Sequence, residues 1–247
     1  SGISVSEGAE NFRIERQEEA YLGCEVVLSL GGDVIKTPGI VYEWSFEGNA
    51  KPIHLRKGGA ECRFTPIDAE PITAVVTALN PEGGFLASAD ISMTAKEFVV
   101  DIAMLAPQPF MLWDANTKQD VAAEGLIAGE AIQFKVGLTP EFKNEIKCRW
   151  NTDASTAIRG GENDIQVTIV RNEIGDAELS VVVTDVHGTL LGRGSKHVNV
   201  PIAKSMVEDS VRRKEAWGLW TTALTQWDAK NFDEAIRNAQ AAATMDP

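Results

Sequence analysis

Three histidines are the first candidates for chemistry, because covalent catalysis usually needs a nucleophile beside an imidazole base. His54 follows Pro52-Ile53, His187 precedes Gly188 in a predicted hairpin turn, and His197 lies in a predicted final strand. None stands in a Gly-x-Ser-x-Gly, His-Glu-x-x-His or cysteine context. The sequence therefore predicts surface histidines and a protein that is not an enzyme.

Carboxylates are the second candidates, since a pair of acids could hydrolyse a glycoside. The acidic residues are scattered over predicted strand edges and turns, which does not favour such a pair. Asp33 and Asp153 lie where the loops of β-sandwiches can bind calcium, but no Asp-x-Asp-x-Asp spacing supports a calcium loop. We expect no cofactor and no metal, with calcium at these turns as the weaker alternative.

The cysteines are Cys24, Cys62 and Cys148, and an odd count excludes a full set of intramolecular disulfides. The sequence contains no Cys-x-x-Cys pair that would support a structural zinc site. Cys24 and Cys62 both fall on predicted inward positions of strands. Two interpretations stay open for them: a disulfide, or two buried thiols.

Tryptophan faces could bind carbohydrate, but three of the six tryptophans fit other roles. Trp44 and Trp150 are better explained as core residues, and Trp113 is expected to seat the joint between two modules. A set of residues spaced at i, i+3, i+7 and i+10 marks one face of a helix. We predict that this face binds a partner through Trp217, Trp220, Leu224 and Trp227.

The charge narrows the class of partner. Lysine and arginine total 23 against 36 aspartates and glutamates, which gives a net charge of −13. Such a surface repels a phosphate backbone, so we expect no nucleic acid. No apolar run approaches the ~20 residues needed to cross a bilayer, and we expect no membrane insertion by this chain.

The elements that must position these side chains repeat along the chain. Gly129 follows Gly23 by 106 positions, and Trp150 follows Trp44 by the same 106, so no gap separates the glycine from the tryptophan in either copy. At this offset Val26 corresponds to Ile132. The sequence therefore predicts two duplicated modules.

Each module reads as all-β. Apolar and polar residues alternate in short runs, which is typical of half-buried strands. In the second module Ile165, Val167 and Ile169 are expected to face inward. Turns are predicted at regular intervals, as in sandwiches and barrels; examples are Gly31-Gly32-Asp33, Gly58-Gly59, Asn80-Pro81 and Gly160-Gly161.

The first module contains Tyr42-Glu43-Trp44-Ser45-Phe46 and, later, the Val/Thr-rich run 74–80. In these two segments it resembles a PKD-type (polycystic kidney disease) domain. Glu47-Gly48-Asn49 replaces the usual Gly-Asp-Gly, and the second module keeps only Trp150, so the broader immunoglobulin-like group is the firmer assignment. The resemblance covers about residues 12–95 and 98–200. It implies a bacterial protein in the periplasm, outside the cell or on its surface.

From Lys204 the β pattern stops, and two helices are predicted. Ser205 or Asp209 could cap the first helix, and the break falls at 231–233. Residues 214–247 resemble a tetratricopeptide repeat, through Lys230 to Ile236 and then Ala239, Ala242 and Met245-Asp246-Pro247.

One such helical pair cannot bury its apolar face alone. It could pack on the neighbouring sandwich, pair with another chain, or continue into further repeats. We favour the third arrangement, because the chain stops where another repeat would start.

The predicted fold class is mainly β: two immunoglobulin-like (PKD-like) β-sandwiches in tandem, over 1–97 and 98–203, and a C-terminal α-hairpin over 204–247. The predicted function is a non-catalytic binding or spacer region of an exported or cell-surface protein. It would mediate protein–protein interaction or assembly through its C-terminal helices, with self-association as an option. The alternative is a carbohydrate- or matrix-binding accessory region of a secreted hydrolase.

Overall fold

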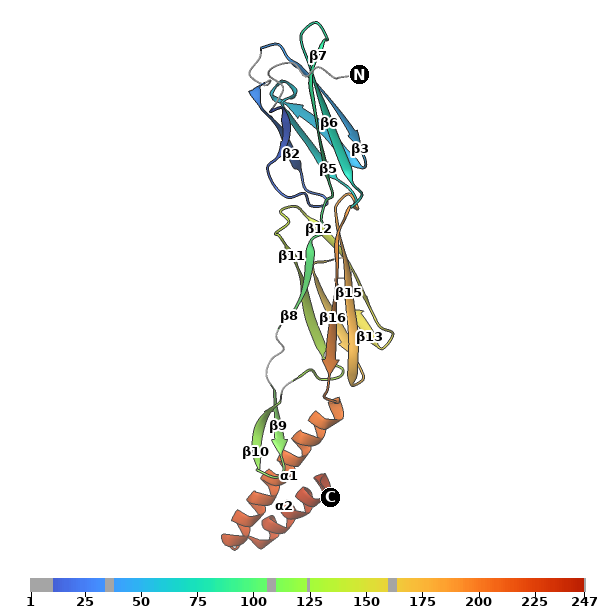
Figure 1. Cartoon of the computed structure of the whole chain (residues 1–247). Coiled ribbons are helices and arrows are strands. Elements are labelled where there is room, and N and C mark those ends of the chain that lie inside the picture. The colour runs from blue at the N-terminus through green and yellow to red at the C-terminus, as the bar shows by residue number, and fades with distance from the viewer. Residues whose placement is uncertain (1–10, 34–37, 106–109, 124, 160–163, 247) are drawn as a thin grey trace. The chain divides into compact units, whose positions relative to one another are not determined.

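The computed structural model describes residues 11–33, 38–105, 110–123, 125–159 and 164–246. As predicted, the protein is mainly β with two helices near its C-terminus (Figure 1). By its internal contacts the chain divides into two compact units. The first comprises the described residues up to Asp101 with 137–149 and 181–194, and the second comprises 102–136, 150–180 and 195–246. The predicted boundaries at 97/98 and 203/204 stay a prediction.

The first sandwich consists of two sheets. One sheet has the strand order β1-β2-β5-β4, and the other has the order β3-β6-β7. Every pairing of neighbours in the two sheets is antiparallel. The bounds are β1 Arg13–Arg16, β2 Val26–Gly31, β3 Val41–Glu47, β4 Ala50–Arg56, β5 Glu61–Pro66, β6 Ile72–Leu79 and β7 Phe85–Met93.

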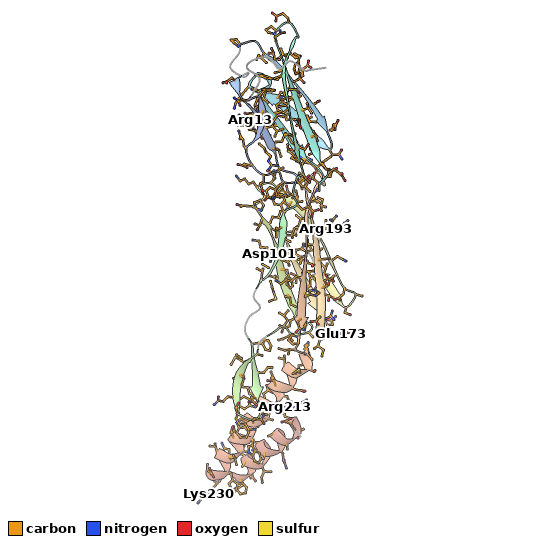
Figure 2. The ribbon with its side chains drawn as sticks, in the orientation of Figure 1. Arg13, Asp101, Glu173, Arg193, Arg213 and Lys230 are labelled. Atoms are coloured by element: carbon orange, nitrogen blue, oxygen red, sulfur yellow. The ribbon has the colours of Figure 1, made fainter. Side chains whose placement is uncertain are left out.

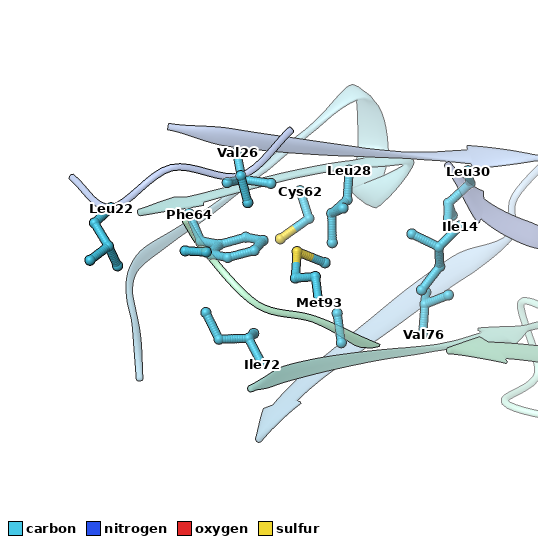
Figure 3. Packing of buried hydrophobic residues seen from close by; sticks show 13 residues of the cluster. Ile14, Leu22, Val26, Leu28, Leu30, Cys62, Phe64, Ile72, Val76 and Met93 are labelled. Atoms are coloured by element: carbon cyan, nitrogen blue, oxygen red, sulfur yellow. The ribbon is translucent and has the colours of Figure 1, made fainter. Parts of the chain in front are cut away.

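Alternate residues of these strands build one core. On β6, Ile72, Ala74 and Val76 are fully buried, and the residues between them are half-buried. Their side chains join Leu28 of β2 and Phe64 of β5 in a single apolar cluster (Figure 3). The alternation arises because successive side chains of a strand point to opposite faces of the sheet.

The second sandwich repeats the topology of the first. Its sheets have the orders β8-β11-β14-β13 and β12-β15-β16, so each strand corresponds to the strand at the same place in the first sandwich, where the orders are β1-β2-β5-β4 and β3-β6-β7. The agreement of seven strands in order supports the predicted duplication. The bounds are β8 Val99–Met104, β11 Ala131–Thr139, β12 Ile146–Thr152, β13 Thr156–Arg159, β14 Gln166–Arg171, β15 Gly175–Asp185 and β16 Leu190–Val200.

One residue of the second sandwich that the sequence predicts to be inward is exposed. Ile165 was expected to face inward, but β14 begins only at Gln166, and Ile165 is exposed while Val167 and Ile169 are buried. The turn predicted at Gly160-Gly161 lies outside the described residues. Its counterpart Gly58-Gly59 forms a short 3₁₀ turn, η2 (Lys57–Gly59), in which both glycines have positive φ.

The two core tryptophans make the same hydrogen bond. The indole Nε1 of Trp44 on β3 donates to the carbonyl oxygen of Gly59 at 2.8 Å, and that of Trp150 on β12 donates to the carbonyl oxygen of Asp164 at 2.8 Å. In each sandwich the indole therefore ties its strand to the turn before a strand of the other sheet. The two indoles differ in burial: Trp150 is buried, whereas Trp44 is half-buried at the margin of its cluster.

The remaining elements are a hairpin and two helices. Strands β9 (Phe110–Asp114) and β10 (Gln119–Ala123) pair only with each other among the described residues, as a two-stranded antiparallel sheet. Helix α1 runs over Lys204–Asp228 and α2 over Phe232–Met245. The predicted caps at Ser205 and Asp209 are wrong: Ala203 precedes the helix in an extended conformation, and both residues lie inside α1.

The difference in burial predicts a difference in stability. Replacing Trp150 by alanine is expected to destabilise its sandwich by about 3–5 kcal/mol, because a large buried side chain leaves a cavity. Trp44→Ala is expected to cost about 2 kcal/mol, since part of that indole already faces water. Urea unfolding followed by circular dichroism measures both. Equal costs, or a larger cost at Trp44, would contradict this account.

Candidate protein-binding site

The three histidines are exposed, as predicted. His54 lies on β4, His187 in the turn between β15 and β16, and His197 on β16. The Asp185 carboxylate accepts the backbone N–H groups of His187 and Thr189, both at 2.8 Å, so this turn is fixed by a carboxylate and not by the imidazole. The predicted lack of catalysis stays a prediction.

Asp153, one of the two acids considered for calcium, has a structural partner. Arg171 is buried, and its Nη1 lies 3.0 Å from both carboxylate oxygens of Asp153. The Ser155 N–H and the Thr156 hydroxyl also donate to Asp153, each at 3.0 Å. Since Arg171 already neutralises this carboxylate, Asp153 anchors the turn after β12 and is not open to an ion.

The other acid considered for calcium, Asp33, is exposed two residues after the end of β2. Within the described part of the chain, no group of three or more His, Cys, Asp or Glu side chains could hold a metal ion. Likewise, no described helix is both long and apolar enough to cross a membrane.

The disulfide alternative for Cys24 and Cys62 is wrong. Cys62 on β5 pairs with Leu28, four residues beyond Cys24, so the two cysteines are about 13 Å apart along the strand. A disulfide needs Cα atoms within about 7 Å. Both residues are thiols: burial raises the pKa of Cys62 to about 11 and also raises the pKa of Cys24.

The prediction that Trp113 seats a joint between the two sandwiches is wrong. It lies on β9, and its backbone N–H donates to the hydroxyl of Ser210, a buried residue of α1. Asp120 of β10 pairs with Lys214 of α1, and the same ammonium lies 5.9 Å from the centre of the Trp113 ring. The β9–β10 hairpin is therefore docked on α1.

Lys118 completes this docking. Its Nζ lies 4.5 Å from the centre of the Trp217 ring, a cation–π contact. Lys118 has φ of 55°, in the left-handed region that disfavours most side chains, and its N–H donates to the carbonyl oxygen of Asp114 at 2.9 Å. The hairpin thus holds Lys118 in a strained backbone conformation, and the Lys118 side chain covers the indole of Trp217 on α1.

Helices α1 and α2 meet through small side chains. The buried residues are Ser210, Ala216 and Ala223 on α1, and Ala235 and Ala242 on α2. Alanines let two helices approach closely but bury little apolar surface. The bulky side chains Trp227 of α1 and Phe232 of α2 touch each other, but both stay about half exposed.

A contiguous apolar surface is left open beside the helix contact. We call it the C-terminal face, and define it as Trp220, Leu224, Trp227, Phe232 and Ile236, whose exposed fractions are 44, 50, 56, 47 and 48%. The Trp227 and Phe232 rings meet edge to face, with centroids 4.9 Å apart. A groove of about 300 Å³ runs along the face, with Ala223, Ala235 and Ala239 lining it beside the larger side chains.

Charged residues lie outside this face. Lys230 stands in the turn between the helices, and Arg213 lies on α1, 3.8 Å from Asp246 (Figure 2). Arg237 is paired with Glu234 on α2. The open surface is thus apolar within and charged beyond it, the pattern of an interaction site.

The four predicted site residues divide into two groups. Trp220, Leu224 and Trp227 share the C-terminal face, whereas Trp217 is half-buried under Lys118. Sequence reasoning missed Phe232 and Ile236 of α2. Their i, i+4 spacing was the available signal. Partner binding by these four residues stays a prediction.

No protein-family model matches the chain, and no curated protein matches it. Solved structures with some likeness include three N-terminal domains of the bacteriophage RB49 Highly Immunogenic Outer Capsid protein, at 12% identity and TM-score 0.37. That match covers 78% of this chain and 59% of the phage chain.

Two further solved structures share the same kind of likeness. The D00-D0 domain of intimin matches at 9% identity and TM-score 0.28, over 76% of this chain and 98% of its own. Fibronectin(III)-like modules of Clostridium thermocellum CbhA match at 11% identity and TM-score 0.26. That match covers 76% of this chain and 94% of the CbhA chain. The PKD-type and tetratricopeptide resemblances stay predictions.

The ion pair of Asp153 predicts a pH dependence. Burial raises the pKa of Asp153, but the Thr156 and Ser155 hydrogen bonds and the Arg171 charge outweigh it and hold the pKa below its usual value. The stability that the ionised group contributes is therefore present above pH ~4 and is lost as the pH falls through the folded pKa. Asp153→Asn is expected to cost about 2 kcal/mol at pH 7 and less at pH 3.

Urea midpoints of the wild type and Asp153→Asn at both pH values test this. Glu173→Gln is the matched control, because Glu173 is exposed on the turn before β15 (Figure 2). The account fails if the cost of Asp153→Asn is independent of pH.

The hairpin docking gives a second prediction. Lys118→Met keeps the side-chain length and removes the charge, so it is expected to weaken the docking by about 0.5–1 kcal/mol. Amide hydrogen exchange in β9 and β10 should then accelerate by roughly 2–5-fold. Lys135→Met, at an exposed position of β11, is the control. Unchanged exchange in the Lys118 variant would show that the cation–π contact contributes nothing.

Proposed function

We propose that this chain is a non-catalytic binding and spacer region in which two β-sandwiches carry a helical pair that docks a protein. The observation that carries the proposal is the C-terminal face. Five large apolar side chains, each about half exposed, form one surface; four of them line a groove, and the fifth, Phe232, packs against the Trp227 ring.

Physical chemistry favours a docking role for this face. Water penalises contiguous apolar surface, so monomeric proteins rarely leave a large patch of it open unless it binds something. Tryptophan is enriched among the residues that dominate binding energy at protein interfaces, and this face holds two. Packing within the helical pair leaves much of these two indoles open, because the buried residues of both helices are small and Trp220 and Trp227 stay 44 and 56% exposed.

The β-sandwiches suit a spacer. Each consists of two sheets that enclose its own buried residues. We place the chain outside the cytoplasm, in the periplasm or on the surface of a bacterial cell, as the PKD-type resemblance implies. There the sandwiches would hold the helical pair away from an attachment point.

Site-specific photocrosslinking tests the proposal in the source cells. A photoreactive amino acid at Leu224 is expected to give a covalent adduct with a protein, identified by mass spectrometry. The matched control carries the same amino acid at Val211, which is 53% exposed on α1 but does not belong to the C-terminal face. An adduct at 224 that is absent at 211 supports docking through this face.

Two outcomes would overturn the proposal. One is the same crosslinking pattern at both positions, or no protein adduct at either. The other is retention of the pure chain on a polysaccharide that Leu224→Asp does not reduce, which would favour the accessory region of a hydrolase.

A further inference from the structure

The chemistry of the groove restricts what can occupy it. Every side chain that lines it is apolar: Trp220, Ala223, Leu224, Trp227, Ala235, Ile236 and Ala239. The backbone groups of both helices are already bonded along the helices. An extended peptide in this groove would leave its own N–H and C=O groups without partners, at a cost of about 1–3 kcal/mol for each buried group. The occupant must therefore satisfy its backbone internally, as a helix does.

The charge distribution indicates which helix can occupy the groove. Residues 204–246 contain six basic and seven acidic side chains, a net charge of −1, whereas the whole chain carries −13. The repulsion that keeps copies of this chain apart thus arises from the residues before Lys204. The helical pair is the nearly neutral part, and it presents helices with apolar side chains.

The area is sufficient for a weak symmetric contact. Large apolar side chains offer about 150–250 Å² each, so the half-exposed C-terminal face leaves roughly 500 Å² open. Two copies would bury about 1,000 Å², near the lower limit of specific interfaces. A two-fold contact uses the same patch on both copies, which this face allows because it contains both a groove and projecting rings.

From these observations we infer that the C-terminal face binds a second copy of this chain, α-hairpin against α-hairpin. The inference rests on the proposed function and names its partner. Contact through about 1,000 Å² implies a dissociation constant on the order of micromolar or weaker.

Sedimentation velocity of the full chain tests this from about 1 to about 500 µM, a range that brackets such a constant. The expected result is a shift from the 26.7 kDa monomer to twice that mass as concentration rises. Raising the salt concentration is expected to strengthen the dimer a few-fold, since salt screens the acidic sandwiches and leaves apolar contact intact. Weakening by salt would contradict an apolar interface.

Variants locate the contact. Leu224→Asp and Ile236→Asp, one on each helix, are expected to remain monomeric up to ~500 µM, while Val211→Asp dimerises like the wild type. Circular dichroism confirms that each variant is folded. Since both substituted side chains are about half exposed, two independent variants guard against a loss of fold at one position.

A monomer at every concentration, or a dimer that survives both face variants, overturns the inference. The proposed function fails separately. If the chain is monomeric but residue 224 crosslinks to a different protein, docking stands and the second copy is the wrong partner. If dimerisation is confirmed and residue 224 crosslinks only to a second copy of this chain, the docked protein is that second copy and not a different protein.

Discussion

Four alanines set how much of α1 the second helix can cover. Ala216 and Ala223 on α1 and Ala235 and Ala242 on α2 are the buried apolar side chains of the helical pair. A contact between such small residues brings the helices close but covers only a narrow strip of each. The aromatic side chains of α1 must then find other cover or remain open. Whether each of these aromatic side chains is covered decides where the protein has an open apolar surface.

The β9–β10 hairpin meets the constraint over part of α1. It brings Lys118 over the Trp217 ring, and it bonds its own backbone to Ser210 and its Asp120 to Lys214. Beyond Trp217 the apolar stripe continues to Trp227 without this cover. The sandwiches need no such arrangement, because each buries its apolar residues between its own sheets and holds its tryptophan by one hydrogen bond to a turn carbonyl.

The sequence predicts the regular parts of this structure well, because their signals are local. Strand alternation and the change to a helical period near Lys204 are readable within short windows, and the duplication is visible because the short run around Trp44 recurs around Trp150. The hairpin is not, because the pairing of Trp113 with Ser210 joins residues 97 positions apart, and 110–114 reads as one more strand. Asp153 shows the same limit: an acid in a loop looks like an ion ligand until Arg171, on another strand, is found against it.

Solvent exchange of the six indole N–H protons, measured by NMR at low protein concentration, tests the central claim directly. Slow exchange is predicted for Trp44 and Trp150, whose N–H groups are bonded to Gly59 and Asp164. Fast exchange is predicted for Trp220 and Trp227 on the open face. If Trp220 and Trp227 are as protected as Trp150 in the dilute monomer, the face is covered from within the chain, and the case for a docking surface is lost.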